Sequence, residues 1–146
     1  MKVSKKTRYG LRLMVELANN YRIGPLSLSE VAGKEGISEK FLGQIMHVLK
    51  SEMPITSVRG PKGGYKLSVP PSKIRVGSIL GVFEPTGLTE CVRNADACRR
   101  SSICKSRAVW VVIDKIVRKS LQSITLADLV SKGRKKNEKR ATARVS

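Results

Sequence analysis

The chain has 146 residues, of which 40% are hydrophobic and 4% aromatic, enough for one small core with appended segments. Its 29 Lys and Arg residues outnumber 11 Asp and Glu, and the resulting formal charge of +18 indicates a polyanionic partner. No stretch approaches the roughly 18 consecutive apolar residues of a membrane span, so we expect a cytoplasmic protein that does not enter a membrane.

The first predicted element is an amphipathic helix from Lys5 to Asn20. Its apolar side chains recur at helical spacing, and the two asparagines at its end break the pattern. These apolar residues are Tyr9, Leu13, Met14 and Leu17.

Two short helices joined by a glycine turn come next. Ser27 and Glu30 have the spacing of a capping box, which predicts a helix start, and the chain turns at Gly36. Ser38 is the N-cap of the following helix, which we expect over Glu39 to Lys50. This arrangement predicts a helix-turn-helix unit.

The second of these helices has the pattern of a recognition helix. Its apolar side chains point inward, whereas Lys40, Gly43, Gln44 and His47 lie nearer the outer face. In the major groove of double-stranded DNA, Gln44 would pair with a base edge and Lys40 with guanine or a phosphate. Ser38 completes the predicted DNA contacts of this helix.

After Pro54 the apolar residues alternate, which predicts a β-hairpin around a basic, glycine-rich tip. A hairpin directly after a helix-turn-helix is a wing. A tip without bulky side chains lets the backbone approach a phosphate or a minor groove, although an ordinary solvated turn has the same sequence features. The predicted contacts are Arg59, Gly60, Lys62, Gly63 and Tyr65. RNA is the weaker partner because the chain has few aromatic residues for base stacking.

The later chain is predicted to be mostly helical. A short helix begins near Ile74 and ends at Glu84, and a loop follows. From Arg99 to Leu121 the pattern predicts a long helix with a broad apolar face, which either packs on its own domain or pairs with a second subunit. Residues 133–146 form a basic run that we expect to be disordered, either aiding nonspecific DNA binding or ending as a solvated tail.

All three cysteines, Cys91, Cys98 and Cys104, lie in one short stretch. An odd number without an export signal argues against a disulfide framework and for metal or redox chemistry. Three thiolates can hold a soft metal or an iron-sulfur cluster, and nearby arginines and lysines favour the thiolate form. Neither gap matches the two-residue knuckle of structural zinc sites; zinc, redox thiols and idle cysteines remain alternatives.

Catalysis is not predicted. His47 is the single histidine, so any Ser/His/Asp or Cys/His unit would depend on this one imidazole. The sequence has neither a P-loop nor a GxGxxG motif opening a helix after a strand. We therefore expect a binding protein rather than an enzyme.

Several segments together resemble the Rrf2 family of bacterial winged-helix transcriptional regulators. They are RYGLRLM, LSLSEVAGKEGIS, SVRGPKGGYKL, the three cysteines and SITLADLV, and the resemblance extends from residue 1 to about 131. It implies a homodimer that binds a palindromic DNA operator. It also implies an iron-sulfur cluster, [2Fe-2S] or [4Fe-4S], held near the dimerisation helix by the cysteines.

Some positions depart from the pattern of the cluster-binding members that this chain resembles. Arg107 stands where some have a ligating histidine, and no carboxylate is present at residues 7–9, where others provide one. The fourth ligand is therefore unassigned, with Glu84, Glu90 and Asp96 as candidate oxygen ligands or simply solvated acids. Gly43 replaces a glutamate that reads DNA, so base preference does not carry over.

The predicted fold is mainly α with a small β-hairpin wing. Its parts are a winged helix-turn-helix domain (1–84), a cysteine-bearing loop (85–98), a dimerisation helix with a short C-terminal helix (99–131) and a basic tail (132–146). The predicted function is that of a homodimeric DNA-binding regulator sensing redox state, nitric oxide or iron-sulfur status. The alternative is a cluster-free regulator of the same fold, controlled by a protein partner or by thiol oxidation.

Overall fold

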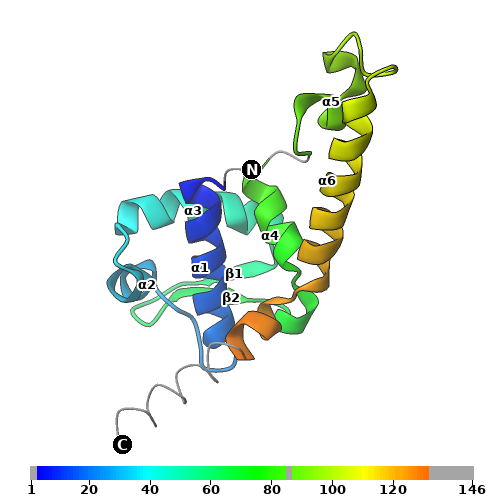
Figure 1. Ribbon diagram of the computed structural model, residues 1–146. Coiled ribbons are helices and arrows are strands. Elements are labelled where there is room, and N and C mark those ends of the chain that lie inside the picture. The colour runs from blue at the N-terminus through cyan, green and yellow to red at the C-terminus, as the bar shows by residue number, and fades with distance from the viewer. Residues whose placement is uncertain (1–2, 85–86, 132–146) are drawn as a thin grey trace, which may run out of the picture.

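The computed structural model describes residues 3–84 and 87–131, so the predicted basic tail at 132–146 lies outside the described residues. Figure 1 shows a helical body around a small hairpin, with one long helix along its side. In chain order the elements are α1 (Lys5–Asn19), α2 (Leu28–Glu35), α3 (Glu39–Glu52), β1 (Ile55–Val58), β2 (Gly64–Leu67), η1 (Pro71–Lys73), α4 (Val76–Phe83), α5 (Glu90–Arg93), η2 (Ala95–Ala97) and α6 (Lys105–Ser123). Residues 126–131 form a final helical segment.

The helix-turn-helix unit has the local hydrogen bonds that its sequence predicts. Ser27 and Glu30 form a complete capping box at the start of α2. Gly36 ends α2 in the left-handed conformation, with φ 63°, and its N–H donates to the carbonyl of Ala32. Ser38 then caps α3 by accepting a hydrogen bond from the N–H of Phe41. The turn between the two helices is therefore fixed at both ends.

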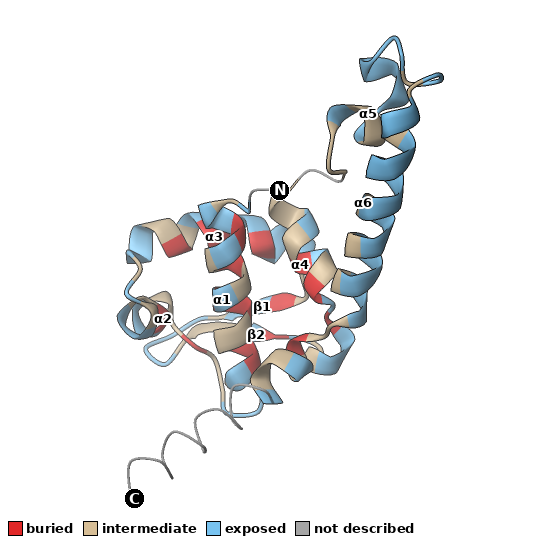
Figure 2. Cartoon of the chain, viewed as in Figure 1, coloured by how far each residue is buried: buried red, intermediate tan, exposed pale blue. Residues whose placement is uncertain are grey.

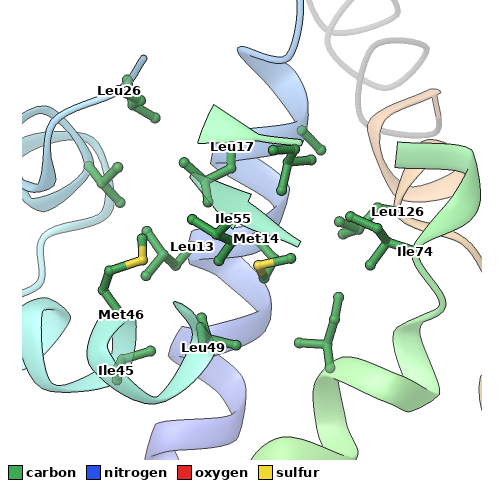
Figure 3. Close-up of a cluster of buried hydrophobic side chains, with 14 of the residues drawn as sticks. Leu13, Met14, Leu17, Leu26, Ile45, Met46, Leu49, Ile55, Ile74 and Leu126 are labelled. Atoms are coloured by element: carbon green, nitrogen blue, oxygen red, sulfur yellow. The ribbon is translucent and has the colours of Figure 1, made fainter. Parts of the chain in front are cut away.

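The hydrophobic core lies between α1, α3, the hairpin and α4 (Figure 3). Leu13, Met14 and Leu17 of α1 are at most 1% exposed and pack with the apolar face of α3. Leu126 is fully buried in the same cluster, so the helix after α6 returns to the core. Residues far apart in sequence thus share one core.

Aromatic and ionic contacts attach α1 to both helices of the helix-turn-helix unit. The Tyr9 ring meets the Phe41 ring edge-on, with centroids 5.8 Å apart, at the start of α3. The guanidinium of Arg12 lies over the Tyr9 ring, and its Nε is 2.6 Å from a carboxylate oxygen of Glu35 at the end of α2. These contacts orient the two helices relative to α1.

Glu84 joins the end of α4 to the start of α1. Its Oε1 accepts a hydrogen bond from the N–H of Ser4 at 2.9 Å and another from the hydroxyl of Thr7. Thr7 is 1% exposed, and its hydroxyl is satisfied by Glu84 and by the Ser4 hydroxyl, at 2.8 Å between the two oxygens. The hydrogen bonds from Thr7 and Ser4 lower the pKa of Glu84. Glu84 is therefore a structural anchor rather than a solvated acid.

The two strands form an antiparallel hairpin in which Ile55 pairs with Leu67 and Val58 with Gly64. A bridge from Leu26 extends this ladder: Leu26 and Tyr65 exchange two backbone hydrogen bonds of 2.9 Å. The winged helix predicted from the sequence is thus confirmed, and the base of its wing is tied to the segment before α2.

The cysteine-bearing segment and α6 form an arm beside the body (Figure 1). Two predictions are wrong here. Cys91 lies in the one-turn helix α5 rather than on a loop, and the long helix begins at Lys105, not at Arg99. Residues 98–103 instead form turns in which the N–H of Ser101 donates to the Cys98 carbonyl and that of Ile103 to the Arg100 carbonyl. Consecutive serines favour such turns because their hydroxyls compete with helical hydrogen bonds.

The far end of the arm is fastened to the body through the backbone. The N–H of Val76 donates to the carbonyl of Ile124 at 2.9 Å, and the N–H of Leu126 donates to that of Ile74 at 3.0 Å.

No helix within the described residues is long and apolar enough to cross a membrane.

Gly64→Ala is expected to destabilise the fold by about 2 kcal/mol or more. Gly64 has φ 152°, and an added Cβ would lie 2.5 Å from the carbonyl carbon and oxygen of Leu26. Urea denaturation measures the change. Gly81→Ala in α4 is the matched control: nothing lies within 4 Å of its Cβ position, so it should stabilise the helix by up to about 1 kcal/mol. Equal stability of the two variants would contradict the structural role of Gly64.

Candidate nucleic-acid interface and cysteine segment

The outer face of α3 carries the side chains predicted to read DNA. Lys40 and Gln44 are exposed one turn apart, and His47 continues the same exposed row. The opposite face of α3 is held in the core by Leu42, Ile45, Met46 and Leu49. Core packing therefore fixes which side of the helix is available to a partner.

The position of Gly43 on this helix is open. The only neighbour near an added Cβ is Leu28 Cδ1 at 4.0 Å, an ordinary contact distance. Packing within the chain therefore does not require glycine there. Without a side chain at this position, α3 has no group there that could contact a partner.

The wing tip has the exposure that a phosphate contact needs. Arg59, Gly60 and Lys62 are exposed, and Gly60 has φ 110°, which favours glycine. The N–H of Gly63 donates to the carbonyl of Gly60 at 2.9 Å and closes the turn. Tyr65 differs from these residues because its backbone bridges to Leu26 and its side chain packs against the core.

A contact that the sequence analysis missed connects the recognition helix to the wing. Lys50 Nζ, near the end of α3, donates a hydrogen bond to Ser57 Oγ of β1 at 3.0 Å. Both side chains are exposed. Their spacing of seven residues across a turn has no local periodicity, so the contact becomes visible only in the folded chain.

The three cysteines occupy three different local structures, and all are free thiols. Cys91 lies in α5, where its Sγ is 3.3 Å from Thr89 Oγ1. Cys98 is exposed directly after η2, and Cys104 is the N-cap of α6. Among the described residues, no group of three or more His, Cys, Asp or Glu side chains is placed to hold a metal ion.

Cys104 has the most polarised environment of the three. A hydrogen bond with the Ser106 hydroxyl, at 3.1 Å between Sγ and Oγ, lowers the pKa of its thiol, and the backbone N–H of Arg107 adds to this effect. The positive charge of Arg100 acts in the same direction. Because the thiolate is the form that binds metals and reacts with oxidants, these contacts favour the reactive form of Cys104.

Of the three candidate oxygen ligands, two have other partners, and the third, Asp96, is exposed in η2 two residues before Cys98. Glu84 is bound to α1, and Glu90 pairs with Arg93 within α5. Arg107 cannot ligate a metal because a guanidinium has no acceptor lone pair. Its Nε instead donates a hydrogen bond to the backbone carbonyl of Cys91 at 2.9 Å.

Helix α6 has a half-buried side and, opposite to it, a side with exposed apolar residues. Asp114, Val117 and Leu121 are half-buried on the side that faces α4 and the body. On the other side, Val109, Val112 and Ile116 are 55%, 56% and 62% exposed. Figure 2 shows this long exposed surface along the arm. The apolar residues predicted for this helix are thus divided between two sides: Val117 and Leu121 lie toward the body, whereas Val109 and Ile116 are exposed.

Known proteins are similar to this chain in sequence and in fold. A family model described as Rrf2, iron-dependent transcriptional regulator, matches residues 3–132. The HTH-type transcriptional regulator CymR of Bacillus subtilis is 36% identical over 132 residues, covering 90% of this chain and 91% of the relative. The HTH-type transcriptional regulator IscR of Yersinia pseudotuberculosis is 31% identical over 151 aligned positions, covering 98% of this chain and 92% of the relative.

A solved structure shows the same fold. It is that of CymR, described as the global cysteine regulator of B. subtilis, with a TM-score of 0.76 and 36% identity over 90% of this chain and 97% of that chain. These matches confirm the resemblance seen in the sequence. Their names are those of transcriptional regulators, in agreement with the prediction that the chain is not an enzyme.

Proposed function

Because the chain belongs to the Rrf2 family of DNA-binding transcriptional regulators, we propose that it binds a palindromic operator as a homodimer and that its cysteine segment controls this binding. The observation that carries the proposal is the exposed outer face of α3, with Lys40 and Gln44, next to a glycine-rich wing with Arg59 and Lys62 at its tip. The formal charge of +18 adds sequence-independent attraction to the phosphates of DNA, which the protein would meet in the cytoplasm.

The two parts of this surface have different tasks. Gln44 and Lys40 enter the major groove and contact base edges, with Ser38 at the helix start beside a phosphate. The wing residues Arg59 and Lys62 contact the backbone or the minor groove, where Gly60 and Gly63 permit close approach. Tyr65, the remaining predicted DNA contact of the wing, is partly buried against the core and also supports the wing from that side.

Two substitutions separate base reading from phosphate binding. Gln44→Ala should cost about 1–3 kcal/mol on the operator and relax the preference at one base pair. Lys62→Ala should weaken binding to all sequences alike and reduce the slope of log affinity against log salt by about 1. Fluorescence anisotropy with operator and scrambled duplexes at several salt concentrations measures both. If Gln44→Ala weakens operator and scrambled DNA equally, α3 is not the reading element.

Dimerisation through α6 explains its uncovered apolar face. Val109, Val112 and Ile116 lie on one side of the helix at spacings of three and four residues. A second α6 packed against this side removes them from water and produces the two-fold symmetry that a palindromic operator requires. The half-buried side of the same helix remains on its own domain.

Ile116→Asp should weaken the dimer by about a hundredfold, because a carboxylate would be buried opposite apolar side chains. Sedimentation equilibrium measures the dissociation constant. Lys115→Asp, on the neighbouring exposed side of the same helix, is the control and should leave the dimer intact. A wild-type protein that sediments as a monomer at all concentrations would refute the proposed interface.

For the signal, we propose that Cys91, Cys98 and Cys104 hold an iron-sulfur cluster, [2Fe-2S] or [4Fe-4S], with the fourth ligand unassigned. The donor type fits such a group, hydrogen bonds from Ser106 and Arg107 and the charge of Arg100 lower the pKa of the Cys104 thiol, and the matched family is described as iron-dependent. The sulfurs would have to draw together, since the described conformation does not assemble three ligands. When bound, a cluster supplies one-electron chemistry that responds to oxidants.

Control by thiol oxidation or by a protein partner is the second candidate. The lowered pKa of the Cys104 thiol favours it, because a thiolate reacts with oxidants without any metal. Cys98 is exposed and lies a few residues away, where it is accessible to the same reagents.

Anaerobic isolation decides between these candidates. A cluster-bearing protein should be coloured, contain iron and acid-labile sulfide, and change its operator affinity when the cluster is lost. The variant with all three cysteines changed to alanine should be colourless and locked in one affinity. A colourless, iron-free protein whose DNA binding still responds to peroxide supports the thiol mechanism. A response that survives in the triple variant excludes the cysteines as the sensor.

A further inference from the structure

Arg107 is the residue that joins the first and third cysteines. It lies in the first turn of α6, and its side-chain Nε donates a hydrogen bond to the carbonyl of Cys91 at 2.9 Å, sixteen residues earlier in the chain. Its own backbone N–H donates a hydrogen bond to the carbonyl of Cys104 at 3.2 Å and also lowers the pKa of the Cys104 thiol. Within the described residues, this is the one side-chain hydrogen bond that connects α5 to α6.

The turn that carries Cys91 depends on such a tertiary contact. Helix α5 has only four residues and no side-chain cap. A helix of this length is not stable alone, since the cost of nucleation exceeds the gain from one turn of hydrogen bonds. Packing against α6 and the bond to Arg107 therefore determine where the Cys91 backbone lies.

The chemistry of arginine suits it to this task. A guanidinium keeps its charge, has a planar donor fork and forms strong hydrogen bonds to a carbonyl oxygen. It does not compete with the thiols for a metal, because it has no acceptor atom. Arg107 and Cys91 are both partly buried, whereas the neighbouring Arg99, Arg100 and Lys105 are exposed.

We propose that Arg107 is a positioning residue of the sensing segment, which fastens the Cys91 turn to the cysteine-bearing end of α6. Arg107 contacts both Cys91 and Cys104. A chemical change at the cysteines is therefore passed to α6 through this residue. This inference rests on the proposed sensing function of the cysteines, but the position of the Cys91 turn is measurable without it.

The first test uses reduced, metal-free full-length protein. Arg107→Gln should raise the rate of amide hydrogen exchange at residues 92–94 and the rate of Cys91 alkylation by iodoacetamide, each by roughly tenfold. Exchange in α1 and α3 should not change. Lys105→Gln removes the same charge from the same end of α6 and should leave both rates at the wild-type value. Equal rates in the two variants would overturn the proposal.

Two further readouts separate positioning from general stability. Arg107→Lys retains the charge without the planar fork, so it should restore the Cys91 alkylation rate only in part. In protein isolated without oxygen, Arg107→Gln should bind the operator normally yet lose most of the affinity change that oxidation causes in the wild type. A full response in Arg107→Gln, despite a released Cys91 turn, would show that this contact does not transmit the signal. If the wild type itself does not respond, the sensing function fails while the exchange result still decides the position of Cys91.

Discussion

The packing of α1 against both α3 and α4 is the constraint on which the other parts of this protein depend. Leu13, Met14 and Leu17 are buried at the centre of the core, and the elements that bind DNA and those that carry the arm pack around them. On one side, Tyr9 meets Phe41 at the start of the recognition helix. On the side of α4, an added Cβ at Gly10 would lie 2.4 Å from the Phe83 ring. Helices α1 and α4 therefore pack so closely that neither can shift toward the other. Close-packed cores respond to such displacement by shifting neighbours together.

Much of this fold was predictable because its signals are local. Capping residues such as Ser27 and Ser38, the glycine turn at Gly36 and the apolar periodicity of α3 act within one or two helical turns, and the structure contains each of them. The start of α6 was mispredicted because Ile103 continues the apolar pattern, yet it lies in a turn and is 72% exposed. Periodicity does not report where turns interrupt a helix.

The parts that escaped prediction depend on long-range contacts. Glu84 has the sequence surroundings of a loop acid, and only folding brings Ser4 and Thr7, about eighty positions earlier, to its carboxylate. Arg107 stands where the resemblance implies a ligating histidine, but its partner is a backbone carbonyl, which has no sequence signature. For the cysteines, the sequence predicts the type of donor but not their spatial arrangement, since α5 and the turns before α6 lack the periodic pattern of a long element.

The arm and the recognition helix are connected by contacts of different stiffness. The segment that follows α6 forms backbone hydrogen bonds with Ile74 and with Val76, the first residue of α4. Helix α4 then meets α1 through Phe83 and Glu84, and α1 meets α3 through Tyr9. The cysteine end of α6, by contrast, is attached to its neighbouring segment mainly by the packing of α5 and by Arg107. Under the proposed sensing function, a rearrangement at the cysteines would therefore act first on the less firmly attached end of α6, and it would reach α4 and α1 through the backbone hydrogen bonds at the other end. The thiols lie at the end of α6 that has fewer attachments, which is the end that the proposed sensing function requires to move.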